Sequence, residues 1–295
     1  MLFVSDDSRT VRAARTRRDF LIITADDFGA SESANEAVEL AAHRGVLTAA
    51  SLMVGAPASA DAVHRARRLP RLRVGLHIVL VDGSAILERA QIPLLVDARG
   101  RFGKHMVIDA FRFVFSPSMR QQLSAEIRAQ FEAFVATGLQ LDHVNAHKHF
   151  HVHPTLLRII LEVGSEFGMR AIRWPREPLL ANEHASQIGQ AMQYAGLSPW
   201  LTLMRRQIDR AGLLHNDSMF GMAASGHMDT RALLRILQHL PSGITEIYSH
   251  PATCSDDSRR ELAALTSRRV RATLRSAFIA RGGYSDALKR QRAHT

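Results

Sequence analysis

Cysteine is almost absent from this sequence, and its scarcity excludes several kinds of site. Cys254 is the only cysteine among 295 residues, so the protein can have neither a disulfide framework nor a thiolate metal cage. Any metal bound by this protein would therefore need histidine and carboxylate ligands.

Long apolar runs are missing as well. No stretch approaches the roughly 20 apolar residues that a membrane-spanning helix needs. The opening residues, MLFVSDDSRTVRAARTRRDF, carry acids and arginines where a signal peptide has its apolar region. We therefore expect a cytoplasmic protein. Apolar residues make up 46% of the sequence, enough for a sizeable core.

Positive charge is abundant and unevenly spread. From Arg259 to Thr295, ten Arg or Lys residues accompany two acids, so this segment carries +8 of the net charge of +10. Such a segment can bind an anionic membrane surface or nucleic acid, or it can be the solvated face of a packed helix. Its apolar spacing favours a packed helix, and it lacks the interleaved aromatic residues of a nucleic-acid platform. No nucleic-acid partner is expected, whereas peripheral contact with the inner membrane surface and a homodimer stay open.

Strand and helix patterns alternate at least six times, which predicts an α/β fold with parallel strands and outer helices. We predict a closed or partly opened (β/α) barrel, with an open doubly wound sheet as the alternative. Residues 1–19 are expected to form a poorly ordered basic extension, 20–285 a single catalytic domain, and 286–295 a basic tail. The strands are expected at 20–29, 46–55, 72–83, 139–147, 169–178 and 243–251.

Polar side chains gather at the carboxyl ends of these predicted strands, the edge where parallel α/β folds build their active sites. Five strands contribute to this set, which is more than chance arrangement readily explains. Its members are Asp26, Asp27, His77, His147, Arg173 and His250.

Two adjacent carboxylates, Asp26 and Asp27, follow the first strand in the stretch ADDFG. On a regular strand they would point to opposite faces, but at a strand end the backbone turns and both can reach one site. One could then bind a metal while the other activates water. Taken alone, the pair would more often be solvated loop residues or helix caps.

The histidine-rich stretch NAHKHFHVHP covers residues 145–154. Alternate side chains of an extended segment are roughly 6.6 to 6.8 Å apart, so four imidazoles could not reach one ion. If the strand ends near Asn145, His147 is the first histidine past it, and we expect it to be the ligand. His149 and His151 are candidates for contact with substrate or with the ligands, and His153 is expected at the surface or at a helix start.

A histidine in the apolar stretch VGLHIVL, His77, would by itself more often be a core residue. Together with an aspartate and a second histidine from other strands, it completes a set that suits one divalent ion with open positions for water and substrate. Such a set suits Zn²⁺, whereas Mg²⁺ prefers more oxygen ligands, and the choice between them stays open.

Four motifs, ADDFGAS, VGLHIVL, HVNAHKHFHVHP and YSHPA, resemble in order and spacing the YdjC-like (ChbG-type) carbohydrate deacetylases. The resemblance runs from about residue 20 to residue 285. The stretches IRWPREP and HNDSMFGMAASG resemble the hopanoid-biosynthesis-associated branch (HpnK) of that family. The family often has an Asp-Ser pair where this sequence has Asn145 and Ala146.

The resemblance implies a (β/α)-barrel-like fold and metal-dependent removal of N-acetyl groups from amino sugars. It implies Asp27, His77 and His147 as metal ligands, Asp26 as general base and His250 as general acid. The ion would polarise the amide carbonyl and acidify a bound water, while the acid protonates the departing amine.

Three further residues are candidates near this site. Arg173 could orient Asp26 through an ion pair, or it could be a surface arginine at a strand end. Trp174 and Phe220 could stack on the apolar face of a sugar ring, although packing roles suit them at least as well.

The substrate implied by the resemblance is an N-acetylglucosaminyl glycan, either attached to a hopanoid lipid or free as a chito-oligosaccharide. The alternatives are another metal hydrolase, a glycoside hydrolase, and a non-enzymatic basic protein that binds membranes or nucleic acid. Glycosidic cleavage is disfavoured because Asp26 and Asp27 are adjacent and poorly placed to flank a bond from opposite sides.

Overall fold

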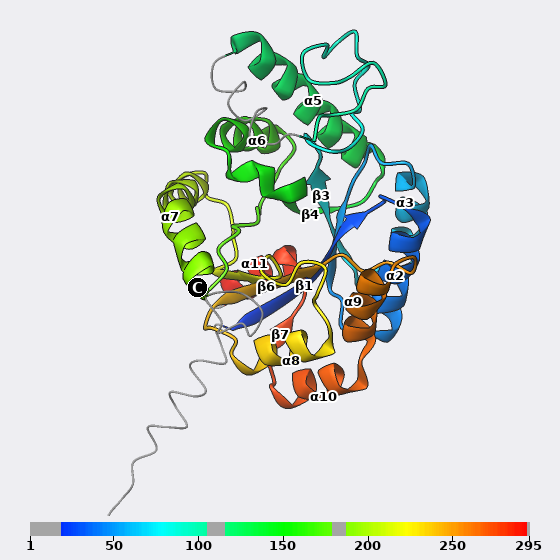
Figure 1. The fold of residues 1–295 in the computed structure, drawn as a ribbon, viewed down its shortest axis with the longest axis vertical. Helices are drawn as coiled ribbons and strands as arrows, with labels where there is room; N and C mark the ends of the chain where they lie inside the picture. The colour runs from blue at the N-terminus through cyan, green and yellow to red at the C-terminus, as the bar shows by residue number, and fades with distance from the viewer. Residues whose placement is uncertain (1–18, 105–115, 179–186, 294–295) are drawn as a thin grey trace, which may run out of the picture.

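A curved parallel sheet organises the fold in the computed structural model, which describes residues 19–104, 116–178 and 187–293. The spatial order of the strands is β4-β3-β2-β1-β6-β5, and β7 pairs with the start of β1 (Figure 1). This order confirms the predicted barrel-like α/β fold. The strands are β1 (Phe20–Phe28), β2 (Ala49–Leu52), β3 (Arg73–Ile78), β4 (Leu141–Ala146), β5 (Ser218–Phe220), β6 (Ile244–Ser249) and β7 (Ala280–Arg281).

The two edge strands of the sheet are joined through an irregular segment, residues 170–176. The backbone N–H of Arg173 donates to the carbonyl of Val144 in β4 at 3.0 Å, and the N–H of Met219 in β5 donates to the carbonyl of Arg176 at 2.8 Å. The strand predicted at 169–178 is therefore wrong as a regular element, because only isolated bridges at Ala171 and Ile172 form there.

Helices surround the outside of the sheet (Figure 1). No helix among the described residues is long and apolar enough to cross a membrane. The helices are α2 (Glu32–Arg44), α3 (Ser59–Arg67), α5 (Pro117–Ala136), α6 (Pro154–Glu166), α7 (Gln187–Arg210), α8 (Thr230–Gln238), α9 (Asp256–Thr266), α10 (Arg268–Ser276) and α11 (Tyr284–Arg292), and a 3₁₀ turn, η1 (His147–Val152), follows β4.

The strand β1 is buried on both faces, as parallel strands covered by helices usually are. Leu21 and Ile23 belong to the main core cluster, which also contains residues of the outer helices, whereas Phe20 and Ile22 belong to a smaller cluster with Tyr284 of α11. Because side chains alternate along a strand, the even-numbered residues of β1 face the barrel interior, and this face ends at Asp26.

Both predicted terminal segments can be placed relative to the described residues. The basic extension at 1–19 lies outside them except for Asp19. The boundary expected at residue 286 falls inside α11, whose Tyr284 and Ala287 are buried. The first turn of this helix therefore packs against the barrel.

Candidate metal and catalytic site

The end of β1 brings two neighbouring carboxylates to the same site. The alternation of β1 directs Asp26 inward, while Asp27 has a left-handed backbone with a φ of 58°. The pairing of β1 with β2 also shifts register between Ala25 and Phe28. An aspartate tolerates this conformation better than most residues, and such strain is often found at functional sites. The expected turn at the strand end is therefore present.

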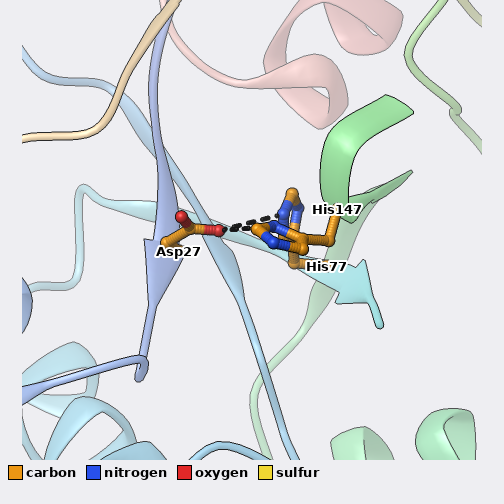
Figure 2. A group of neighbouring side chains, drawn as sticks. All are labelled: Asp27, His77 and His147. Atoms are coloured by element: carbon orange, nitrogen blue, oxygen red, sulfur yellow. Dashed lines mark hydrogen bonds and ion pairs between the residues drawn. The ribbon is translucent and has the colours of Figure 1, made fainter. Parts of the chain in front are cut away.

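Asp27, His77 and His147 come from β1, β3 and the first residue of η1, and their side chains converge (Figure 2). One ligand atom from each lies within 4.8 Å of the others. The Asp27 Oδ1 atom is 3.0 Å from His147 Nδ1 and 3.3 Å from His77 Nε2. The predicted grouping of these three side chains is confirmed.

The chemistry of this group fits a divalent cation. Burial raises the pKa of Asp27, but its close contacts with His147 and His77 outweigh this effect and lower the pKa well below its usual range. The carboxylate is therefore ionised. His77 Nε2 is buried and has no hydrogen-bond partner among the described residues. An ionised carboxylate facing two imidazole nitrogens is a donor set typical of such metal sites.

Arg173 lies fully buried beside Asp26 and forms the ion pair considered from the sequence. Its Nη1 and Nη2 atoms donate to Asp26 at 2.5 and 2.9 Å, and its Nε and Nη2 atoms donate to Glu246 at 2.8 Å each. Burial raises the pKa of Asp26, yet the charge of Arg173 outweighs it, and the pKa lies well below its usual range. Asp26 is therefore an oriented, ionised carboxylate.

Asn145 connects Asp26 with His77, a role that the sequence analysis missed. Its side-chain oxygen lies 2.7 Å from His77 Nδ1, and its side-chain nitrogen donates to Asp26 Oδ1 at 3.2 Å and to Ser51 Oγ at 2.9 Å. Partners of this kind orient a metal-ligating histidine. Asn145 lies directly opposite His77 in the β3–β4 register. A polar residue paired with a predicted metal ligand was the feature that could have indicated this role.

The histidine run does not continue as an extended segment. Lys148 and His149 both have left-handed backbones, and residues 147–152 form the 3₁₀ turn. Only His147 joins the three-residue group, as expected, although the assumed extended geometry is wrong. His153 occupies the N-cap position of α6, which confirms the expected helix start.

His149 and His151 differ in their surroundings. His149 Nε2 lies 3.0 Å from the Tyr248 hydroxyl, and its Nδ1 is buried without a hydrogen-bond partner in the described part of the chain. Burial and Arg173 lower the pKa of His149 well below its usual range. His151 is fully buried and its Nε2 donates to the Arg173 carbonyl at 3.0 Å. Full burial and this contact give His151 a structural role, and the partial exposure of His149 makes it the better candidate for substrate contact.

His250 follows β6 and is partly exposed. Its backbone N–H donates to a carboxylate oxygen of Glu261 at 2.5 Å. Its ring packs edge-on against Tyr248, and a positive charge on this ring is the last-ranked of the interactions that lower the pKa values of Asp26 and Asp27. The residue therefore lies at the same site as the two carboxylates.

Trp174 and Phe220 occupy packing positions. They are only 4% and 1% exposed, and the Trp174 indole N–H donates to the Leu201 carbonyl at 2.9 Å. With both rings inside the core, neither presents a face for stacking on a sugar. Their burial does not support the substrate contacts predicted for them.

Glu246, which also escaped the sequence analysis, accepts four side-chain hydrogen bonds inside the barrel. The donors are the Thr24 hydroxyl, two nitrogens of Arg173 and the Tyr284 hydroxyl. The signal for it was weak: one charged residue in the stretch ITEIYS, whose strand is buried throughout.

Comparison of this chain with known proteins identifies a family model and several relatives. The family model described as "YdjC-like protein" matches residues 20–276. A carbohydrate deacetylase of Brevibacillus brevis is 30% identical over 235 residues, which are 79% of this chain and 81% of the relative. A carbohydrate deacetylase of Vibrio vulnificus is 28% identical over 281 residues, which are 91% of this chain and 96% of the relative.

A solved structure shares the fold. A protein from Enterococcus faecalis, described as a proposed cellobiose-phosphate cleavage protein, superimposes with a TM-score of 0.71 and 23% sequence identity. The match covers 91% of this chain and 98% of that one. Because the family model spans the strands β1 to β6 and all three residues of the candidate metal group, the chain belongs to the YdjC-like protein family.

Proposed function

We propose that this protein is a metal-dependent hydrolase that removes the N-acetyl group from an amino-sugar glycan. The observation that carries the proposal is the position of the Asp27–His77–His147 group beside the ionised, oriented Asp26. The relatives named carbohydrate deacetylase support the substrate class.

Asp27, His77 and His147 would bind the cation, and two imidazoles with one carboxylate favour Zn²⁺ over Mg²⁺. A divalent ion there would supply polarisation of the amide carbonyl and acidification of water. Asp26 accepts the proton from the attacking water. Arg173 binds both Asp26 oxygens, so this carboxylate cannot rotate away from the position that its partners define.

The departing amine requires a proton, because an amide anion is a very poor leaving group. His250 is the side chain that we assign to this step, since it lies near both carboxylates and its backbone is fixed by Glu261. His149 has a buried Nδ1 without a partner among the described residues, which would suit a hydroxyl or acetamido group of the sugar.

We propose a glycan that reaches the site from solution, such as a chito-oligosaccharide. The resemblance to the hopanoid-associated branch suggested a lipid-linked glycan, with the basic C-terminal segment at the membrane. However, the helix α10 leads into β7, which pairs with Phe20 and Leu21 at the start of β1. The candidate site lies at the other end of that strand, roughly 20 Å away at about 3.3 Å per residue. Membrane contact through the part of this segment near β7 would leave the site distant from the lipid.

The test is acetate release from a panel of acetylated substrates, with mass spectrometry of the products. The panel contains chito-oligosaccharides and an N-acetylglucosaminyl lipid in vesicles, each with chelator-stripped protein and with Zn²⁺ or Mg²⁺ restored. We expect deacetylation of the soluble oligosaccharides only with the ion present, and best with Zn²⁺.

The matched variants are Asp27→Asn and Asp256→Asn, the latter on the exposed first turn of α9. Loss of activity in the first and retention in the second would support the assignment. Acetate release that survives both chelation and Asp27→Asn would contradict it, and release from the lipid substrate alone would refute the preference for a soluble glycan.

A further inference from the structure

A continuous series of buried side chains runs through the barrel interior from α11 to the candidate metal ligand. We call it the interior path. Each neighbouring pair is within hydrogen-bond distance: His143 Nδ1 lies 2.9 Å from Asp142, Ser51 Oγ lies 3.1 Å from His143 Nε2, and Asn145 donates to Ser51 at 2.9 Å. Its members are Asp142, His143, Ser51 and Asn145, and all of them are buried.

The interior path begins beside α11 with Asp142, which is held in place as a hydrogen-bond acceptor. The Asp142 carboxylate accepts hydrogen bonds from the backbone N–H groups of Tyr284 and Ser285, in the first turn of α11, at 3.0 and 2.9 Å. Burial raises the pKa of Asp142, but contacts with His143 and Ser285 outweigh it and lower the pKa below its usual value. An ionised carboxylate only accepts, so His143 Nδ1 carries a proton, and in the neutral imidazole His143 Nε2 is then an acceptor.

This acceptor fixes the direction of each following hydrogen bond. Ser51 donates its hydroxyl proton to His143 Nε2, so its oxygen accepts from the Asn145 side-chain nitrogen. The Asn145 oxygen then faces His77 Nδ1 at 2.7 Å and accepts its proton. His77 Nε2 consequently keeps its lone pair, and this is the atom that faces Asp27.

The opposite arrangement would disable the ligand. An amide has almost the same shape after a half-turn, so packing alone does not choose its orientation. If the Asn145 nitrogen faced His77 Nδ1, the imidazole proton would move to Nε2, which could no longer bind a cation. Asp26 also favours the observed orientation, but its contact with Asn145 is longer, at 3.2 Å against 2.9 Å for Ser51.

We propose that Asp142, His143 and Ser51 are positioning residues that select, through Asn145, the tautomer of His77 able to bind a metal. The proposal rests on the metal-ligand role proposed for His77, but not on the deacetylation reaction. It connects the packing of the C-terminal helix with the electronic state of a residue at the opposite end of the barrel.

The test is direct observation of histidine tautomers in ¹⁵N-labelled, metal-free full-length protein by long-range ¹H–¹⁵N correlation NMR. In the wild type, both His77 and His143 should carry the proton on Nδ1. The variants are Ser51→Ala, which interrupts the interior path, and Thr245→Val as matched control. Thr245 is a buried strand residue whose hydroxyl has no hydrogen-bond partner in the described part of the chain.

We expect a mixture of His77 tautomers in Ser51→Ala and about tenfold weaker Zn²⁺ binding by chelator competition, the lower end of the range for partners of metal ligands. Thr245→Val should match the wild type in both measurements. In the double variant Ser51→Ala/Asn145→Asp, a carboxylate accepts from His77 in either orientation, so the Nδ1–H tautomer should return.

Two results would overturn the proposal. The first is a wild-type spectrum in which His77 or His143 carries its proton on Nε2, and this needs no variant to fold. The second is a folded Ser51→Ala protein whose His77 tautomer and Zn²⁺ affinity equal those of Thr245→Val. Neither readout depends on catalysis, so failure of the proposed deacetylase activity would leave this test intact.

Discussion

Replacing Glu246 by glutamine should strongly destabilise the protein, although the two side chains have nearly the same shape. One Glu246 oxygen accepts from the Thr24 hydroxyl at 2.6 Å and from Arg173 at 2.8 Å. The other accepts from Arg173 at 2.8 Å and from the Tyr284 hydroxyl at 2.6 Å. A glutamine would therefore present its NH₂ group to two donors, whichever way the amide lies.

The magnitude follows from these contacts. Hydrogen bonds to charged groups contribute roughly 1.5–3 kcal/mol each, and two of them would be lost. Removal of one partner from a buried ion pair costs about 3–5 kcal/mol. This figure describes the loss of the same contacts, so the two values are not added. Because Arg173 keeps Asp26 as a partner, we expect a loss of about 3–5 kcal/mol, which lowers Tm by on the order of 10 °C.

Urea unfolding of Glu246→Gln and Glu126→Gln would check this reasoning. Glu126 is equally buried, but it accepts from the backbone N–H groups of Ile86 and Leu87 and from the Gln130 amide, with no cation among these donors. Burial raises the pKa of Glu126, so a neutral replacement should cost less there. Equal losses of stability in the two variants would refute the argument that the interior ion pair requires the Glu246 charge.

Three further predictions follow from the same geometry. Asn145→Leu should weaken Zn²⁺ binding about 10–100-fold in chelator competition, because His77 loses the partner that orients it. Burial and Arg173 lower the pKa of His151 to about 3, so its ring signals should not titrate between pH 7 and pH 4 in NMR. The folded pKa of His151 lies below its unfolded value of 6.5, so the unfolded chain binds a proton first. The free energy of unfolding should therefore decrease as pH falls from 6.5 to about 3. Trp174→Ala should cost about 3–5 kcal/mol in unfolding experiments and leave KM unchanged, because the ring packs inside the core.

The residues of the candidate metal group could be predicted because each follows a local sequence pattern that determines its position in the fold. Asp27, His77 and His147 all stand at the carboxyl end of an apolar, β-branched or alternating stretch, and parallel strands bring those ends to one edge. The barrel order follows from the same alternation of strands and helices. These inferences needed no knowledge of distant contacts.

The geometry of the histidine run could not be obtained in this way. The left-handed backbones of Lys148 and His149 turn the chain immediately after β4. Lysine gives no signal for such a conformation, and the enrichment of histidine in it is too weak to predict the turn. The turn directs His151 into the core, where it bonds the Arg173 carbonyl. Only the packed barrel provides that acceptor, so the sequence predicted a candidate substrate residue where the structure has a buried support.

The interior polar residues were missed for a related reason. Glu246 and Ser51 stand in stretches that read as ordinary buried strands, and their partners lie far away in the sequence. A buried charge is interpretable only once its counterion is known, because burial without one is costly. Arg173 was considered as a partner of Asp26, but nothing local indicated that it also pairs with Glu246.

The two adjacent carboxylates owe their different roles to their partners and not to their order in the sequence. Both Asp26 and Asp27 have lowered pKa values, yet by different means. Asp26 is paired with Arg173, which has no lone pair to share with a cation. Asp27 faces two imidazole nitrogens, which in their neutral form can act as ligands of a cation. A divalent ion should therefore be bound on the Asp27 side and leave Asp26 as the proton acceptor. The low pKa of Asp26 makes its carboxylate a weak base. It can therefore accept a proton in catalysis only from a water molecule whose pKa the site has already lowered.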